Sequence, residues 1–92
     1  MLRSQKGGLI CGFKGVNMAG KRILRSMLDV FKIFLKGEQY DMQRAVCVAN
    51  MRIIAREFGK PSPEIDYLLT FPTYASEEEY NNLYNILRDY VG

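Results

Sequence analysis

Residues 76–91 have the sequence SEEEYNNLYNILRDYV, which predicts an amphipathic α-helix. Ser76 and Glu79 have the spacing of a capping box, in which each side chain accepts a hydrogen bond from the other residue's backbone N–H. Glu77 and Glu78 add negative charge at the positive end of the helix dipole. The apolar residues that follow recur on one helical face: Tyr80, Leu83, Tyr84, Leu87, Tyr90 and Val91. We therefore expect this helix to cover a core with a single stripe.

Residues 19–36 and 41–58 also have helical periodicity, but their apolar residues spread beyond one face. Gly37 between them is a natural C-terminal stop, and Asp41 is the predicted N-cap of the second helix. The second helix has two apolar arcs, one of Met42, Val46, Ala49 and Ile53 and the other of Cys47, Val48, Met51, Ile54, Ala55 and Phe58. A helix that is apolar on two sides is usually central in a bundle.

A short helix is predicted over residues 63–70, with Ser62 as its N-cap and Pro63 in its first turn. The predicted fold is therefore all-α: a small helical bundle of three long helices and one short helix. Residues 18–92 form its single domain. One shared core is expected, and the residues predicted to be buried together in it are Leu28, Phe31, Ile54 and Leu87.

Residues 1–17 are Gly-rich and lack helical periodicity, which predicts a loose or short-stranded N-terminal arm. The segment Lys14-Gly15-Val16-Asn17-Met18 can be encoded by a purine-rich run of the kind that precedes bacterial start codons. Our hypothesis is that Met18 is a true or alternative start and that residues 1–17 are a translated leader. The nucleotide sequence tests it, because codons without such a run would contradict it.

The composition leaves few groups for catalysis or metal binding. The 92 residues include no His and only two Cys, Cys11 and Cys47. His is the commonest general base and metal ligand, and two distant Cys cannot form a zinc site alone. We therefore expect no catalytic residue, no metal and no cofactor. No apolar run approaches the ~20 residues of a membrane span, which disfavours a membrane partner and favours the cytoplasm.

Charge is divided unevenly along the chain. Residues 1–36 carry eight Lys and Arg against one acid, a net +7, whereas residues 37–92 carry five against nine, a net −4. Five basic residues share one side of the helix predicted at 21–36 and are here called the basic stripe: Lys21, Arg22, Arg25, Lys32 and Lys36. Such a stripe predicts contact with a polyanion or an acidic partner, the alternative being a solvated helix face.

The stretch 51–70 resembles a helix-turn-helix. Small, turn-forming and apolar residues have the spacing of that motif at Ala55, Gly59, Ile65 and Leu68. The resemblance implies that the helix at 63–70 reads DNA. That helix, however, carries Glu64 and Asp66 and has no Lys, Arg, Asn or Gln to contact phosphates and bases. The pattern therefore fits an ordinary angled helix pair better than a DNA-reading unit.

These observations favour a small, non-catalytic regulatory or inhibitory protein, encoded by a phage or mobile element, that binds a protein partner. The predicted partner-binding residues are the acids and exposed aromatic residues of the turn-rich region: Glu64, Asp66, Tyr67 and Tyr74. The alternative is a DNA-binding protein that uses the unit at 51–70 together with the basic helix at 21–36. A homo-oligomer is compatible with either hypothesis.

Overall fold

The computed structural model describes the backbone of residues 6–92 and the side chains from residue 20 onward. Its elements are the helices α1 (Lys6–Ile33), α2 (Asp41–Phe58), α3 (Pro63–Leu69) and α4 (Glu77–Val91), with a short 3₁₀ helix, η1 (Glu38–Tyr40), before α2. The prediction of an all-α bundle with three long helices and one short helix is confirmed.

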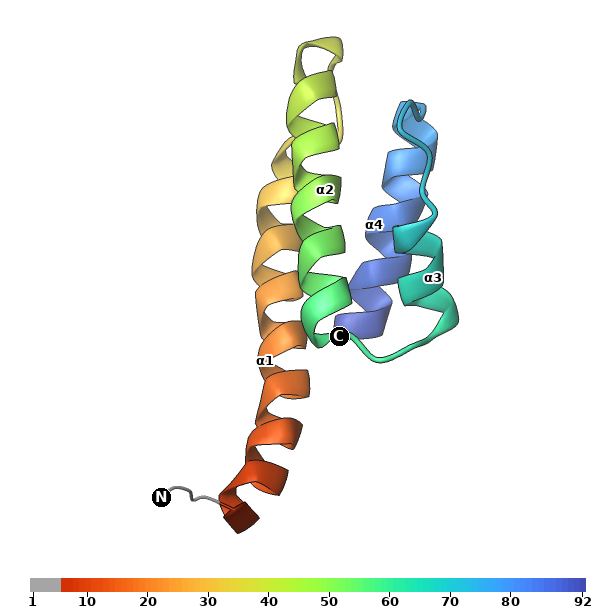
Figure 1. Cartoon of the computed structure of the whole chain (residues 1–92). Coiled ribbons are helices and arrows are strands. Elements are labelled where there is room, and N and C mark those ends of the chain that lie inside the picture. The colour runs from red at the N-terminus through yellow and green to blue at the C-terminus, as the bar shows by residue number, and fades with distance from the viewer. Residues whose placement is uncertain (1–5) are drawn as a thin grey trace.

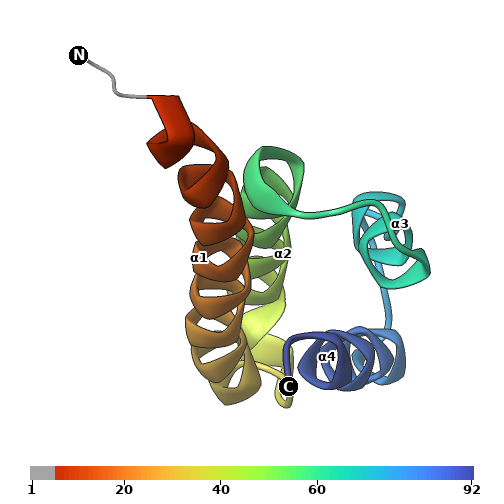
Figure 2. The same cartoon turned by 90° about the horizontal axis from the view of Figure 1, so that it is seen from below.

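The four helices are arranged at the corners of a square. Helices α1 and α2 form an antiparallel hairpin, α4 packs beside α1, and α3 packs against both α2 and α4 (Figure 1). Seen along the hairpin, α1 and α2 make one layer and α3 and α4 make the other (Figure 2). Each helix therefore packs against two others, and its side that faces away from the centre of the square has no helix neighbour.

A single core fills the space between the layers. Its fully buried members come from every helix, and the largest are Phe31, Leu24, Met51, Leu68, Leu83 and Leu87. The predicted burial of Leu28, Phe31 and Leu87 is confirmed. The predicted full burial of Ile54 is wrong, because this residue is only partly buried and packs against the outside of the core.

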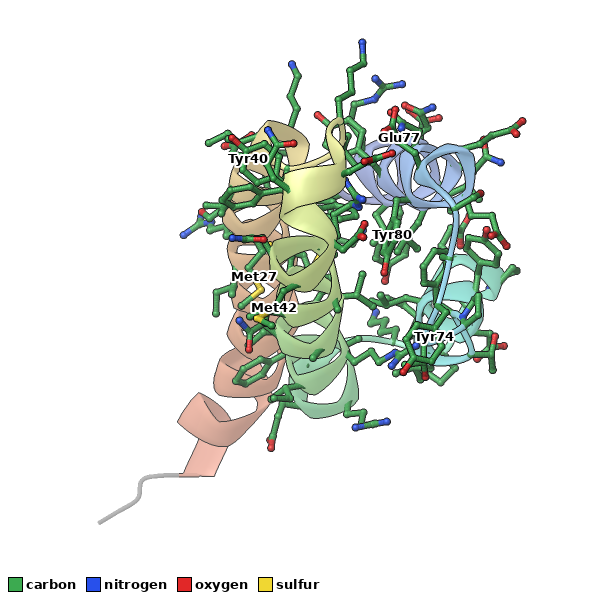
Figure 3. The ribbon with its side chains drawn as sticks, turned by 90° about the horizontal axis from the view of Figure 1, so that it is seen from above. Met27, Tyr40, Met42, Tyr74, Glu77 and Tyr80 are labelled. Carbon is green, nitrogen blue, oxygen red and sulfur yellow. The ribbon has the colours of Figure 1, made fainter. Side chains whose placement is uncertain are left out.

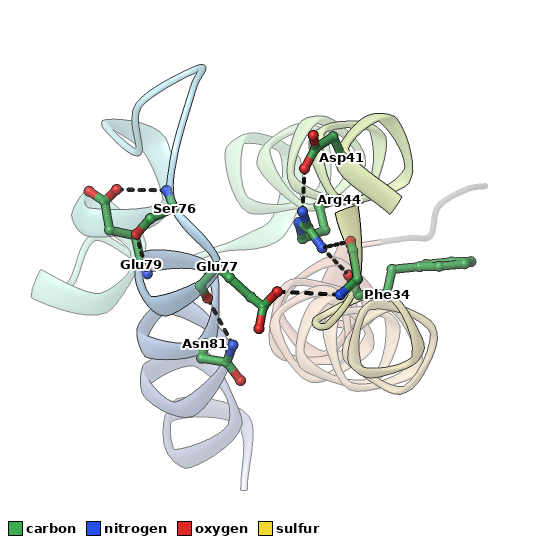
Figure 4. A network of polar contacts seen from close by, with 8 residues as sticks. Phe34, Asp41, Arg44, Ser76, Glu77, Glu79 and Asn81 are labelled. Atoms are coloured by element: carbon green, nitrogen blue, oxygen red, sulfur yellow. Dashed lines mark hydrogen bonds and ion pairs between the residues drawn. The ribbon is translucent and has the colours of Figure 1, made fainter. Parts of the chain in front are cut away.

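Two of the three predicted helix caps are confirmed. The Ser62 hydroxyl accepts a hydrogen bond from the Ile65 N–H at 3.1 Å. At the start of α4, Ser76 and Glu79 form the reciprocal capping box at 3.1 and 2.8 Å (Figure 4). The N-cap assigned to Asp41 is wrong, because the chain enters α2 directly from η1. Tyr40 then occupies the cap position without a side-chain hydrogen bond.

Helix α1 begins earlier than the glycine content indicated. It starts at Lys6, so residues 6–17, expected as a loose or stranded arm, are helical; the first five residues of that arm lie outside the described residues. Adding turns to an existing helix avoids a new nucleation step, although each glycine costs about 1 kcal/mol relative to alanine. In Figure 1 this part of α1 continues past the end of α2. Whether Met18 is the start stays a prediction.

Gly20 of α1 lies close against Phe58 at the end of α2, and replacing it with alanine is expected to destabilise the fold. A Cβ at this position would lie 2.5 Å from Phe58 Cβ and 3.3 Å from the Phe58 carbonyl oxygen. Alanine favours the helix by about 1 kcal/mol, but forcing the helices apart costs about 1–3 kcal/mol. We therefore expect Gly20→Ala to lower the free energy of unfolding in a urea titration. Ser26→Ala, on the exposed side of α1, is the control, and equal stability of the two variants would contradict the close approach.

Candidate protein interface

Helix α2 contains three arginines, and the two in its body point into the molecule. Arg44 is only 3% exposed, and its Nη1 donates hydrogen bonds to the carbonyls of Phe34 and Gly37, both at 3.0 Å (Figure 4). Its Nη2 pairs with the Asp41 carboxylate, and its guanidinium lies 5.3 Å from the centre of the Tyr80 ring. Arg44 therefore joins the end of α1, the start of α2 and the first turn of α4.

Arg52 has a similar role at the other neighbour of α2. Its Nε donates to the Leu68 carbonyl at 3.1 Å, and its Nη2 donates to the Phe71 carbonyl. These carbonyls lie at and just after the C-terminus of α3, where backbone acceptors lack intrahelical donors. A cation there also complements the negative end of the helix dipole. Arg52 thus fixes α3 onto α2.

Because both arginines are used internally, the outward side of α2 carries no charge over three turns. Every exposed residue between positions 42 and 53 is uncharged: Met42, Gln43, Ala45, Val46, Ala49, Asn50 and Ile53. Met42 is 76% exposed, Val46 52% and Ile53 53%. The expectation that α2 is central in the bundle because it is apolar on two sides is therefore wrong. Only the arc that contains Val48, Met51 and Ala55 meets the core, because α2 has neighbours on that side alone.

Helix α1 continues this exposed surface beside α2. Ile23, Val30 and Ile33 are exposed on α1, and Met27 and Phe34 are half-buried. We call the combined surface the apolar face and define it by these residues: Ile23, Ser26, Met27, Val30 and Ile33 of α1, Phe34 just after α1, and Met42, Gln43, Val46, Ala49, Asn50 and Ile53 of α2. Figure 3 places Met27 and Met42 at the hairpin, whereas Tyr80 and Tyr74 lie toward α4 and α3. The apolar face is therefore on the side without a helix neighbour.

The apolar face offers contact area rather than reactive chemistry. Its polar side chains are the hydroxyl of Ser26 and the amides of Gln43 and Asn50, none of which ionises. Cys47 lies half-buried beside the face, and burial raises the pKa of its thiol, which keeps it in the weakly nucleophilic protonated form. Burial also raises the pKa of the Tyr80 hydroxyl, with Arg44 opposing the shift. The arrangement can bury apolar area against a partner.

Four residues of the basic stripe lie on α1 and Lys36 lies just after it, and two of these five residues have structural contacts. The Arg25 Nη2 donates to the Val91 carbonyl at 2.6 Å, and the Lys21 ammonium lies 4.8 Å from the centre of the Tyr90 ring. Both contacts hold the C-terminal end of α4 onto α1. Arg22, Lys32 and Lys36 are exposed. The ion pairs among the described side chains are Asp41–Arg44 and Arg88–Asp89, so no stripe residue is in an ion pair there.

The partner-binding residues predicted on and after α3 are not brought near the basic stripe. Helix α3 lies across the bundle from α1 in Figure 2. Tyr67 is half-buried and packs edge-on against Phe71, with 5.8 Å between ring centres. Glu64 is half-buried, Asp66 is exposed, and Tyr74 is 93% exposed on the connection to α4. Tyr67 thus has a packing role, which leaves Asp66 and Tyr74 as the free groups on this side.

The structure agrees with the helix-turn-helix motif only in how α2 and α3 are connected. Helices α2 and α3 pack together and are joined by four residues, as that motif requires. Helix α3, however, has only seven residues, with Glu64 and Asp66 both in its first turn. In a DNA-reading helix the N-terminal residues are the ones that contact base edges. Two carboxylates there would face the negative charge of the DNA.

Within residues 6–92 no helix has the length and apolar composition needed to cross a membrane. The same part of the chain has no cluster of three or more Cys, Asp or Glu side chains that could hold a metal ion. No protein-family model, curated protein sequence or solved structure matches this chain.

Proposed function

We propose that this chain is a small, non-catalytic regulatory protein that acts by binding a protein partner through the apolar face. The observation that supports the proposal is that the exposed residues of α2 between positions 42 and 53 carry no charge and lie beside the exposed apolar residues of α1. The centres of protein interfaces are depleted of charged residues, and contiguous exposed apolar patches mark interaction sites. A solvated helix would be expected to carry its charged residues there instead.

DNA binding is the alternative function, and the basic stripe is the feature that favours it. Lys32, Lys36 and Arg22 are exposed and could neutralise phosphates. The acids at the start of α3 oppose DNA reading by the helix-turn-helix-like unit, and the contacts of Lys21 and Arg25 with α4 reduce the number of free cations. Protein binding is therefore the better-supported function.

A capture experiment distinguishes the two functions. The tagged chain is incubated with nuclease-treated bacterial lysate, and bound proteins are quantified for wild type and for Val46→Glu and Ile53→Glu. We expect both variants to lose a specific partner, because each places a charge in the centre of the apolar face. Ile86→Glu is the matched control, since Ile86 is a partly exposed apolar residue on α4.

Retention of every bound protein by Val46→Glu and Ile53→Glu, together with a chain that does not associate with itself through this face, would contradict the proposal. Duplex DNA is tested in parallel at low salt with Lys32→Glu and Lys36→Glu, which leave the contacts of Lys21 and Arg25 intact. Salt-sensitive DNA binding that these two variants weaken, with no protein partner lost from the face variants, would establish the alternative function instead.

A further inference from the structure

We propose that the partner of the apolar face is a second copy of this chain, so that two α1–α2 hairpins pack face to face about a two-fold axis. This inference rests on the proposed function, because it names the partner of the same surface. A two-fold interface must be self-complementary, since the same residues are contributed by both copies. The composition of the apolar face meets that requirement in charge, in hydrogen bonding and in area.

Charge restricts which side of the molecule can meet its own copy. The chain has a net charge of +3, and the basic stripe would oppose five cations to five others. The exposed residues of α2 between positions 42 and 53 carry no charge, so two copies can meet there without like-charge repulsion. On α1 the exposed residues Ile23, Val30 and Ile33 are likewise uncharged, and the exposed charged residues Arg22 and Asp29 border them at the edge of the face. An uncharged surface is complementary to itself.

The polar groups of the apolar face can also pair with their own counterparts. An amide or a hydroxyl both donates and accepts hydrogen bonds, so Gln43, Asn50 and Ser26 can each bond to the same residue type in a second copy. A partner with fixed carboxylates or ammonium groups would instead leave either the donors or the acceptors unused. The exposed polar groups of this face therefore fit a neutral, amide-bearing surface like itself.

Asn50 lies at the middle of the face and defines where the two-fold axis should pass. On α2 it is flanked one turn away by Val46 and Ile53, and all three side chains are exposed. An asparagine between apolar residues in a helical interface selects one register, because its amide must meet the partner's amide. Placing Asn50 opposite its own copy also places Val46 of each chain near Ile53 of the other when the two α2 helices are antiparallel.

The available area is sufficient for a specific dimer only if both helices take part. Eighteen helical residues are ~27 Å long, and two adjacent helices are ~20 Å wide. The hairpin thus offers about 500 Å² per copy, or about 1,000 Å² in total, which is the lower end for a specific interface. We therefore expect a dimer of micromolar affinity, built as a helical layer on a helical layer.

Sedimentation equilibrium of the purified full-length chain tests the proposal over about 1–500 µM, a range that spans micromolar dissociation constants. Wild type should change from monomer to dimer across this range. Val46→Glu and Ile53→Glu should weaken dimerisation at least about 10-fold, because each places two carboxylates in the interface. Ile86→Glu on α4 should dimerise like wild type. Circular dichroism and thermal melting of each variant establish that it remains folded.

Charge pairing at Asn50 tests the position of the axis. Asn50→Asp alone and Asn50→Lys alone should each remain monomeric, because like charges would meet at the axis. An equimolar mixture of the two should form a heterodimer, because the charges then attract. Two variants that stay monomeric when mixed, beside a wild-type chain that dimerises, would place the contact elsewhere and overturn the proposal.

A wild-type chain that is monomeric at every concentration also overturns the proposal. The capture experiment then decides the fate of the proposed function separately. A foreign partner that Val46→Glu loses and Ile86→Glu keeps would leave the apolar face as a protein-binding surface with a different occupant. A monomeric chain that captures no face-dependent partner would contradict both the inference and the proposed function.

Discussion

Replacing Phe31 with alanine should lower the free energy of unfolding by about 3–5 kcal/mol, the cost of deleting a buried aromatic ring. Phe31 is 0% exposed and lies between the two layers of the bundle. Its ring centre is 6.1 Å from that of Tyr80 in an edge-on arrangement and 6.4 Å from that of Tyr84. The substitution removes the apolar ring, both aromatic contacts and the packing between α1 and α4. Urea unfolding of the purified variant measures the loss.

Lys32→Ala is the control for Phe31→Ala, because Lys32 is the next residue on α1 and is exposed. We expect its midpoint of unfolding to match that of wild type. A loss below about 1 kcal/mol for Phe31→Ala would mean that α4 does not pack on this face of α1, since a fully buried ring cannot be deleted so cheaply. A variant too unstable to purify can be replaced by Phe31→Leu, for which we expect a smaller loss of the same sign.

Helix starts and stops could be predicted from the sequence wherever they depend on local chemistry. Ser62 and the Ser76–Glu79 pair cap their helices through hydrogen bonds to residues three positions away, so the pattern contains the whole interaction. The N-cap of α2 was predicted wrongly, because η1 precedes the helix and the Asp41 carboxylate pairs with Arg44 instead of capping. A local sequence pattern therefore predicts a helix cap correctly only where no neighbouring element changes how the chain enters the helix.

The side of each helix that meets the core was harder to predict. Periodicity shows which residues of α2 share an arc, but it does not show whether another helix lies against that arc. The sequence pattern did contain one unused signal. Arg44 has helical spacing with Val48, Met51 and Ala55, so it belongs to the buried arc and not to the solvated one. Assigning Arg44 and Arg52 to the interior would have left the opposite arc without charge from Met42 to Ile53 and indicated the apolar face.

The candidate binding residues show the same limit. Periodicity placed the basic stripe on one helix, and Lys21, Arg22, Arg25 and Lys32 do lie on α1, but α1 ends at Ile33 and Lys36 lies after it. The contacts of Lys21 with Tyr90 and of Arg25 with the Val91 carbonyl could not be predicted, because they join positions almost seventy residues apart. The exposure of Tyr74 could be predicted from its turn-rich surroundings. The packing of Tyr67 on Phe71 could not, because it depends on how the chain bends after α3.

Replacing Arg44 with methionine should cost about 2–4 kcal/mol of stability, from two half-buried acceptors that lose their donor and from lost packing. Methionine keeps much of the side-chain volume but donates no hydrogen bond. The carbonyls of Phe34 and Gly37, both at 3.0 Å from Nη1, then lose a buried donor where α1 ends. Arg44→Lys should not restore stability, because a single ammonium cannot serve these carbonyls, the Asp41 carboxylate and the Tyr80 ring together.

An opposing effect decides how large the loss from Arg44→Met will be. Burying a guanidinium is costly, and the Nε of Arg44 is buried without a hydrogen-bond partner among the described residues. If desolvation dominated, Arg44→Met would be neutral or stabilising, as it is for some buried ion pairs. We expect the reverse, because Asp41 is largely exposed and the carbonyls gain no replacement donor. Arg88→Met, at an exposed arginine on α4, is the control, and equal unfolding midpoints for the two variants would show that water satisfies the end of α1.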